Sequence, residues 1–470
     1  MTAERNTIRL ISVLVFVILG ITASATYAEP NQAAEPNQLW KVKEERLCSI
    51  SSAAKGFTRS ASIHGCRIAW AELRGTQQVV VVDGRAEPEY DAVLVGSIVF
   101  SSDGKRLAYG VRKGTRQFVV VDGQAGPEYD GIYSAPIFSL DGKRIAYVAK
   151  KGGKLFVVVD GQAGPECDDV GNLVFSPDGG RVAYAVQKGK KWFVVVDGQA
   201  GPEYDGLSAV LVFSSDGKRL AYDAQKGGKW FVVVDGKAGP EYDSIGKASI
   251  VFSPDGGRVA YSAQKGGKWT VVVDGQAGPE YDNVYASAGI VFSPDSKRVV
   301  YGAQKGFKWI VVIDGQAGTD YEVIGSPIFS PDGNHVAYIA QKYNKWFVVE
   351  DGQDDPNRQE YDGVNNLVFS PDGKQMAYAA QSAQKNYRWF VVINGQVKPE
   401  YDEVSNLVFS SDGGHIAYTA QEGKQWRVIV DGQAGPDCDG VICRPVFLED
   451  GTLEYIVARG SSIYRVKATP

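Results

Sequence analysis

A unit of about 40 residues repeats along most of the chain, and no other feature restricts the fold as strongly. The stretch VFSPDGGRVAYSAQKGGKWTVVVDGQAGPEYD, residues 251–282, recurs with small changes and without linkers. A fixed period of this length is typical of propellers, solenoids and repeat arrays. A degenerate copy at residues 62–70 brings the total to about eleven units. The aspartates of the FSxD motif recur every 37 to 40 residues, at Asp103, Asp141, Asp178, Asp216, Asp255, Asp295, Asp332, Asp372, Asp412 and Asp450.

Each unit divides into four short runs that read as β-strands. In the copy above, IVF precedes the turn SPDG, RVAYSAQ alternates apolar and polar residues, and KWTVVV is rich in β-branched residues. Asp274-Gly275 then predicts a two-residue hairpin turn. Because no stretch shows a sustained 3.6-residue period, we expect almost no helix.

A four-stranded sheet of this size cannot bury enough apolar surface alone, whereas copies stacked in a ring can. The sequence therefore predicts an all-β fold, a β-propeller of about eleven four-stranded antiparallel blades. Propellers typically have four to eight blades, so ordinary blade geometry favours two rings of five and six blades. The uniform spacing favours one wide ring, and both alternatives stay open.

The two ends of the repeat array complement each other. The last unit offers three strands, PVFLEDG, TLEYIVARG and SSIYRVKA, and lacks a fourth. Residues 39–50 form an orphan strand ahead of the first unit. We expect this strand to complete the last blade, so that residues 39–470 form the propeller array.

The residues before the array read as an export signal. Arg5 and Arg9 precede a 12-residue apolar run, and small residues follow as far as Ala28. We expect a cleaved signal peptide at residues 1–28, a disordered spacer at 29–38, and no membrane span after cleavage. The expected location is periplasmic or extracellular.

The motif FSPDGKRxAY followed by a VVxDG strand resembles the WD-like repeats of the TolB-like family of exported bacterial propellers. The resemblance covers roughly residues 60–466. It implies four-stranded antiparallel blades with the first strand innermost. The chain departs from this family because no α/β domain precedes the array, the units are more numerous, and the repeats are more alike.

The five cysteines fit no zinc pattern, and no metal site is expected. Export predicts an oxidising compartment, in which some cysteines pair. Cys48 lies in the orphan strand, and Cys438 and Cys443 lie near the C-terminus. We hypothesise that a disulfide between the ends clasps the ring. The pairing of Cys66 and Cys167 stays open.

Most repeated residues are explained by structure. An aspartate before glycine in a tight turn serves the backbone, and a lone aspartate makes a poor calcium site. One tyrosine in the second strand of each unit, such as Tyr261, predicts packing between blades. The lysines between the second and third strands share one face with the aspartates of the EYD motif, which favours a solvated surface over an anion site.

The sequence shows no catalytic set, since its three histidines fall at separate turns. We expect no enzymatic activity, no catalytic residue and no cofactor, and a net charge of −5 does not favour nucleic acid. The predicted function is a non-catalytic scaffold that binds a protein or an envelope glycan through the face that carries these loops. The alternatives are a lectin-like propeller and an enzyme with its site at the propeller centre.

The binding residues expected on the rim are the Lys-Trp pairs of the third strand and two loop tyrosines. Departures from the consensus in units eight and nine, at residues 342–345, 351–362 and 382–389, favour an asymmetric site there. The candidates are Lys229, Trp230, Lys268, Trp269, Lys308, Trp309, Tyr343 and Tyr387.

Overall fold

The structure is a computed structural model that describes residues 40–49, 59–61, 67–284, 289–353 and 358–470. The chain divides into two units, residues 1–33 and residues 34–470, and only the second contains described residues. The first unit, the expected signal peptide at residues 1–28 and the expected spacer at residues 29–38 all lie outside the described residues. Among the described residues, no helix has the length and apolar character needed to cross a membrane.

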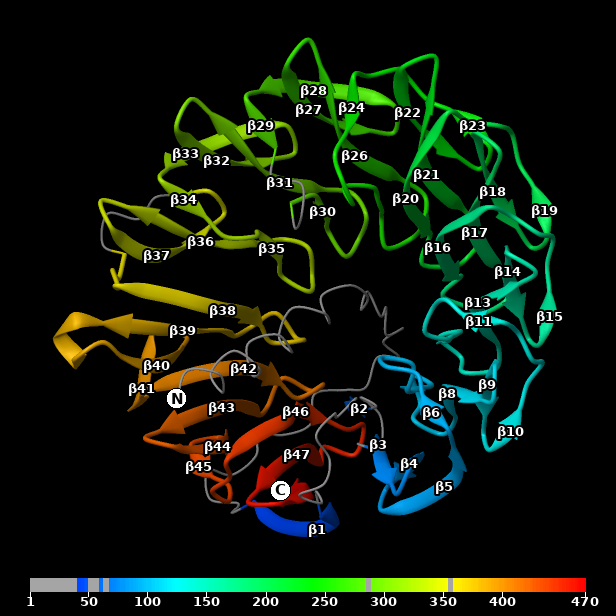
Figure 1. Cartoon of the computed structure of the whole chain (residues 1–470). Helices are drawn as coiled ribbons and strands as arrows, with labels where there is room; N and C mark the ends of the chain where they lie inside the picture. The colour runs from blue at the N-terminus through cyan, green and yellow to red at the C-terminus, as the bar shows by residue number, and fades with distance from the viewer. Residues whose placement is uncertain (1–39, 50–58, 62–66, 285–288, 354–357) are drawn as a thin grey trace. The chain divides into compact units, whose positions relative to one another are not determined.

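The described part of the second unit forms eleven small antiparallel sheets arranged as an eleven-blade β-propeller (Figure 1). In each blade the first strand is nearest the ring centre, and five blades have a first strand split in two. The first strands are β2 (Arg59–Ala61), β6 (Ala92–Val93) with β7 (Val99–Phe100), β11 (Gly131–Ile132) with β12 (Ile137–Phe138), β16 (Asp169–Phe175), β20 (Gly206–Phe213), β24 (Ser244–Ile245) with β25 (Val251–Phe252), β29 (Asn283–Val284) with β30 (Val291–Phe292), β34 (Val323–Ile324) with β35 (Ile328–Phe329), β38 (Gly363–Phe369), β42 (Glu403–Phe409) and β46 (Gly440–Phe447).

The second and third strands form the central hairpin of every blade. The second strands are β3 (Ile68–Arg74), β8 (Leu107–Lys113), β13 (Ile145–Lys151), β17 (Val182–Lys188), β21 (Leu220–Lys226), β26 (Val259–Lys265), β31 (Val299–Lys305), β36 (Val336–Lys342), β39 (Met376–Ser382), β43 (Ile416–Glu422) and β47 (Leu453–Arg459). The third strands are β4 (Gln77–Val82), β9 (Arg116–Val121), β14 (Lys154–Val159), β18 (Lys191–Val196), β22 (Lys229–Val234), β27 (Lys268–Val273), β32 (Lys308–Ile313), β37 (Lys345–Glu350), β40 (Arg388–Ile393), β44 (Gln425–Val430) and β48 (Ser462–Thr469).

Five of the ten fourth, outermost strands have only two residues, which limits edge-to-edge pairing with other chains at those blades. They are β5 (Arg85–Tyr90), β10 (Gln124–Ala125), β15 (Gln162–Ala163), β19 (Gln199–Ala200), β23 (Lys237–Ala238), β28 (Gln276–Tyr281), β33 (Gln316–Tyr321), β41 (Gln396–Tyr401), β45 (Gln433–Ala434) and, in the last blade, β1 (Lys41–Ser49). In blade 8 a bridge between Glu350 and Gln353 takes this place. The one helix assigned in the described residues is the 3-10 turn η2 (Ala383–Lys385).

The turns have the backbone geometry that the sequence predicts. Asp274 and Gly275 both have positive φ, 52° and 80°, as a type I′ hairpin turn requires. In the FSxD turn, Ser253 Oγ donates a hydrogen bond to Asp255 Oδ1 and the Gly257 amide donates to the same oxygen. These bonds hold the pKa of Asp255 below its usual range, with the serine contribution larger. The aspartate therefore serves the turn.

The hydrophobic core of this protein lies between blades. The described residues contain eleven apolar clusters, and each joins two successive blades or the last blade to the first. In eight seams a buried tyrosine of the second strand meets, edge-on, the tyrosine at the EYD position of the preceding blade (DYE at Tyr321), with ring centroids 5.9 to 6.4 Å apart. The prediction that these tyrosines pack between blades is confirmed.

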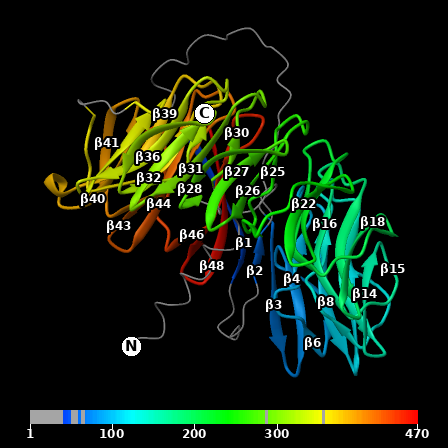
Figure 2. The ribbon, with the colours of Figure 1, turned by 90° about the horizontal axis from the view of Figure 1, so that it is seen from above.

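The last blade packs against the first, which closes a single ring. Trp70, Val79 and Val81 of the first blade share a buried cluster with Ile456 and Ile463 of the last. Figure 1 places β46 beside β2, and in the view from above in Figure 2 the last blade and the first blade are again neighbours. The eleven-blade propeller is thus one ring, and the alternative of two rings is wrong.

The strand β1 supplies the outermost strand of the last blade. It pairs antiparallel with β48, from Lys41 opposite Thr469 to Ser49 opposite Ser462. Ahead of it, the Trp40 side chain is buried, and its indole Nε1 donates a hydrogen bond to Asp431 Oδ2 of blade 10, 3.1 Å away. The N-terminal strand therefore ties the last two blades together.

The disulfide clasp is not formed through Cys438 and is excluded by distance for Cys443. The Cys438 thiol is free and donates to the Trp426 carbonyl, and burial raises the pKa of this thiol to about 11. Cys48 and Cys443 lie on β1 and β46, the opposite edges of one four-stranded sheet. Three strand spacings separate their Cα atoms by about 14 Å, and a disulfide needs less than about 7 Å. Cys66 and the side chain of Cys48 lie outside the described residues.

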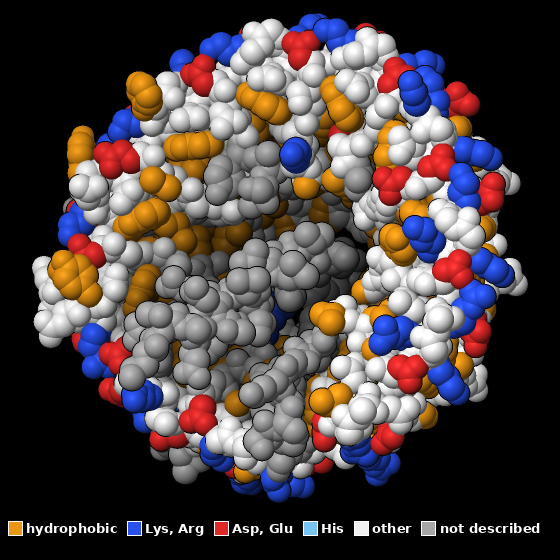
Figure 3. All heavy atoms as spheres, in the orientation of Figure 1, with side chains coloured by type: hydrophobic (Ala, Val, Ile, Leu, Met, Phe, Trp, Pro, Cys, Tyr) orange, Lys and Arg blue, Asp and Glu red, His pale blue; other side chains and the backbone are white. Residues whose placement is uncertain are grey.

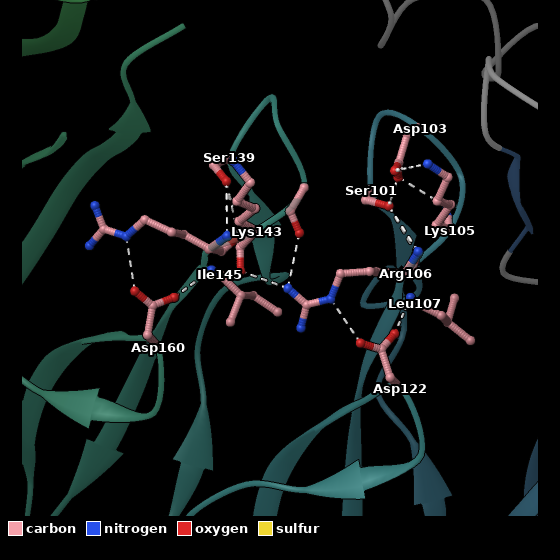
Figure 4. A network of polar contacts seen from close by, with 12 residues as sticks. Ser101, Asp103, Lys105, Arg106, Leu107, Asp122, Ser139, Lys143, Ile145 and Asp160 are labelled. Carbon is pink, nitrogen blue, oxygen red and sulfur yellow. Dashed lines mark hydrogen bonds and ion pairs between the residues drawn. The ribbon is translucent and has the colours of Figure 1, made fainter. Parts of the chain in front are cut away.

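A repeated arginine clamps neighbouring blades on the face that carries the FSxD turns (Figure 4). Arg106 Nε donates to Asp122 Oδ2 at 2.8 Å within its own blade. Its Nη1 donates to the carbonyl oxygens of Gly142 and Lys143 in the next blade, and its guanidinium lies over the Phe138 ring. Arginine suits this position because its planar fork bonds in two directions at once. The same clamp is made by Arg67, Arg144, Arg181, Arg219, Arg258 and Arg298.

Blades 8 to 10 replace this arginine. His335 Nδ1 lies 2.8 Å from Asp351 Oδ2 in its own blade. Gln375 Nε2 donates to the Gly413 carbonyl of the next blade at 3.0 Å. His415 lies 2.6 Å from Asp431 and edge-on to Trp40. The ring is therefore less uniform in this sector.

Removal of β1 is expected to weaken closure of the ring. A variant that begins at Ile50 leaves the β48 edge unpaired and removes Trp40, so its thermal unfolding midpoint should fall well below that of the full chain. A variant that begins at Trp40 is the control and should unfold like the full chain. Equal midpoints for both, measured by circular dichroism, would contradict a closing role for β1.

His335→Arg is expected to stabilise the protein by about 1 kcal/mol, because it adds charge-assisted bonds to the equivalent carbonyls of Gly373 and Lys374. The hydrogen bond that His335 donates to Asp351 raises the pKa of His335, so the stability that this histidine gives is full below its ordinary pKa of about 6.5 and is lost as the pH rises. The gain should therefore be larger at pH 8 than at pH 5. The control in urea unfolding is His335→Lys, which lacks the planar guanidinium of arginine. An equal gain in unfolding free energy for His335→Lys would contradict the arginine clamp.

Candidate functional site

The lysine-loop face is the face of the ring formed by the turns between second and third strands and by the connections to the next blade. Hydrogen bonds show that these two sets of loops meet. Lys268 Nζ at the start of β27 donates to Asp282 Oδ1, 2.5 Å away, in the connection to blade 7. The Gly306 amide in the turn of blade 7 donates to Asp282 Oδ2 at 2.7 Å. One carboxylate thus holds two blades together, and we call this arrangement the carboxylate clamp.

The clamp accounts for the predicted lysines. Lys229 Nζ donates to Asp243 Oδ1 at 2.7 Å, and Lys308 Nζ lies 3.7 Å from a Glu322 oxygen. The lysine bond, and then the amide bond from the next blade, hold the pKa of Asp243 below its usual range. Lys229, Lys268 and Lys308 are therefore paired with carboxylates. The same clamp occurs at Lys154–Asp168, Lys191–Asp205 and Lys345–Asp362.

The predicted tryptophans contribute to the seams. Trp230, Trp269 and Trp309 are half-buried, and each packs against the apolar cluster that joins its blade to the next. The backbone of Trp230 also forms a bridge with Tyr242. Their role in ligand binding stays a prediction, but much of each ring is already used in packing.

Three other aromatic side chains stand out from the lysine-loop face. Tyr343 is 78% exposed and Tyr387 is 62% exposed, and their role in binding stays a prediction. Phe307, which the sequence analysis missed, is 97% exposed. Its signal in the sequence was the change of the turn from KGGK to KGFK in unit seven. We call Phe307, Tyr343 and Tyr387 the aromatic row.

Local turn chemistry fixes the backbone of the row. Gly306 precedes Phe307 with a φ of 62°, which matches a hairpin turn with glycine first. Tyr343 and Asn344 form a turn in which both φ values are positive, 54° and 59°. The Tyr387 carbonyl accepts a hydrogen bond from Gln381 Nε2 at 2.6 Å after the short helix η2.

The carboxylate clamps connect the three blades that carry the row. Glu322 lies next to Lys308 of blade 7 and accepts a bond from the Tyr343 amide of blade 8. Asp362 accepts bonds from Lys345 of blade 8 and from the Ala383 amide of blade 9. The row therefore alternates aromatic rings with ion pairs. In Figure 3, hydrophobic side chains stand out at the left rim, where charges of both signs are interleaved.

Two cavities lie elsewhere on the described surface. One of about 620 Å³ lies at the closing seam, where Arg67 pairs with Asp83 and where Arg85 and Glu87 also line the wall. The other, of about 380 Å³, lies between the first strands of blades 3 and 4 and is lined by Ile137, Leu173 and the polar Ser134 and Asn172.

Acidic and metal-ligating side chains are dispersed in the described part of the ring. Within it, no three His, Cys, Asp or Glu residues lie close enough to hold a metal ion. Asp223 on β21 is buried, accepts a bond from Ser208 Oγ, and has a pKa raised by burial.

Among the comparisons with known proteins, only solved structures match this chain. No protein-family model matches the sequence, and no curated protein matches it. Solved structures that match include a eukaryotic initiation factor, with 14% identity and a TM-score of 0.38 over 67% of this chain and 91% of that one. TolB from Acinetobacter baumannii matches with 20% identity and a TM-score of 0.25 over 44% and 60% of the two chains. The Dos1 propeller matches with 12% identity and a TM-score of 0.31 over 63% and 91%. At these values the matches carry no inference about function.

The carboxylate clamps are expected to make stability depend on pH at acid values. Because folded Asp243 has a lowered pKa, its contribution is present above the ordinary aspartate value of about 3.9 and is lost as the pH falls through the folded pKa. Asp243→Asn should therefore reduce the slope of unfolding free energy against pH between about pH 2 and 4. Glu241→Gln, at an exposed carboxylate two residues earlier, is the control. An unchanged slope in the Asp243 variant would refute the clamp.

Proposed function

We propose that this protein is an exported, non-catalytic propeller scaffold that binds a protein or an envelope glycan through its lysine-loop face. The observation that carries the proposal is the aromatic row, on three consecutive blades. The corresponding turns of the other described blades carry Gly, Lys, Thr or Ser. Export rests on the sequence pattern of residues 1–28.

An exposed aromatic side chain on a rigid turn adds no packing energy to the fold and reduces solubility. A partner that covers these rings removes them from water, which favours binding. The charged side chains around the row are already engaged in joining blades, because Lys308 lies next to Glu322 and Lys345 pairs with Asp362. The repeated surface is thus structural, and the departures from the repeat support binding.

The two alternative functions stay as predictions. A lectin-like role through the Lys-Trp pairs would use tryptophans that already pack in the seams and lysines that already pair with carboxylates. For an enzyme, the cavity between the first strands of blades 3 and 4 is the place to test.

The triple variant Phe307→Ala, Tyr343→Ala, Tyr387→Ala is expected to lose most binding to envelope material. Immobilised protein would be incubated with envelope extract, and the captured proteins and sugars would be quantified. The matched control is the triple variant Thr76→Ala, Thr115→Ala, Ser461→Ala, which changes exposed turn residues of blades 1, 2 and 11. Both variants should keep the wild-type thermal midpoint. Equal capture by the two variants would reject the aromatic row as the site.

A further inference from the structure

We propose that the aromatic row binds an uncharged, linear carbohydrate chain laid across blades 7, 8 and 9. This inference rests on the proposed function, because it names the ligand class of the same face. It follows from the alternation of rings with ion pairs, from the local charge balance, and from the distribution of the rings over three blades.

The alternation suits a ligand that has both apolar faces and hydroxyl groups. Between Phe307 and Tyr343 lies the pair Lys308–Glu322, and between Tyr343 and Tyr387 lies the pair Lys345–Asp362. A sugar ring offers C–H faces that pack on an aromatic ring. Its hydroxyls donate to a carboxylate and accept from an ammonium group. A sugar chain can therefore contact the rings and the ion pairs together without breaking the pairs.

A protein partner fits this surface less well. The centre of a protein interface is depleted of charged residues and excludes water. Covering the row with a flat apolar surface would also desolvate Glu322 and Asp362, whose hydrogen bonds hold neighbouring blades together. Desolvating ion pairs without new hydrogen bonds is costly. Hydroxyl groups supply such bonds.

The local charges favour a neutral ligand. Lys308 and Lys345 are next to carboxylates, and Arg388 at the start of β40 lies within 3.1 Å of Glu422 and near Asp402. Lys385 in η2 pairs with Glu400 at 2.7 Å. A polyanion would have to displace these carboxylates, and a polycation would have to displace the lysines. An uncharged chain displaces neither.

The ligand must be longer than one or two sugars. Neighbouring sheets pack roughly 10 Å apart, so rings on three successive blades span about 20 Å or more. A short oligosaccharide reaches one ring, whereas a long one reaches all three. Affinity should therefore rise with chain length until the row is covered.

Calorimetric titration with oligosaccharides of defined length tests the proposal. The probes are β-1,4-linked glucose, β-1,4-linked N-acetylglucosamine and α-1,4-linked glucose, each as dimer and hexamer, with polygalacturonate as the acidic comparison. We expect a hexamer of at least one neutral series to bind at least about tenfold more tightly than its dimer. Each single ring removal should weaken hexamer binding by about three- to tenfold.

Two variants provide controls on the site. Tyr133→Ala removes a 60% exposed tyrosine from blade 3, away from the row, and should leave affinity unchanged. Lys424→Tyr places an aromatic residue in the turn of blade 10 at the position equivalent to Phe307, and should strengthen binding of long chains. Thermal midpoints equal to wild type would show that every variant is folded.

The outcomes separate this inference from the proposed function. If no neutral hexamer binds, or if dimers bind as tightly as hexamers, the carbohydrate inference is overturned. If the triple variant still loses capture of an envelope protein, the lysine-loop face remains the binding face, and its partner is a protein. If the triple variant loses neither glycan nor protein, both proposals fail.

Discussion

Contact between neighbouring blades is the interaction on which the rest of this structure depends. A blade of three or four short strands has two apolar faces and no second layer of its own, so it folds by packing against copies of itself. Every apolar cluster in the described residues accordingly crosses a seam. At each edge of the seam, a polar clamp also orients the two neighbouring blades through hydrogen bonds. Arg258 reaches the carbonyls of the next blade on one face, and Asp282 accepts an amide from the next blade on the other.

Because the clamps use the charges, the repeated surface is close to neutral. Arg258 is paired with Asp274 within its blade, and Lys268 is paired with Asp282. Such exposed pairs add little stability individually, but here each also orients a hydrogen bond across a seam. A surface balanced in this way has little attraction for a charged ligand. Specific recognition is therefore expected where the repeat changes, as at Phe307 and Tyr343.

The last blade closes the linear array of repeats into a ring. Its outer strand comes from the N-terminal end of the array, so the two ends of the array pair within one sheet. Glu44 on this strand accepts two hydrogen bonds from Arg459, and Trp40 anchors the strand to blade 10. The long exposed edge of β1 carries charged residues, which discourages pairing with another chain.

The sequence by itself determined the features that depend on local geometry and period. Asp274-Gly275 predicts its hairpin turn because only some residues adopt positive φ readily, and Tyr261 predicts a seam contact because it recurs at one strand position. Tertiary structure decided the number of rings, since ring closure depends on the angle between blades and not on any one residue. It also decided that Lys268 is paired and Trp269 is half-buried, because both depend on the neighbouring blade. The exposure of Phe307 could not be derived from its residue type, because an aromatic residue is buried or exposed according to what lies above its turn.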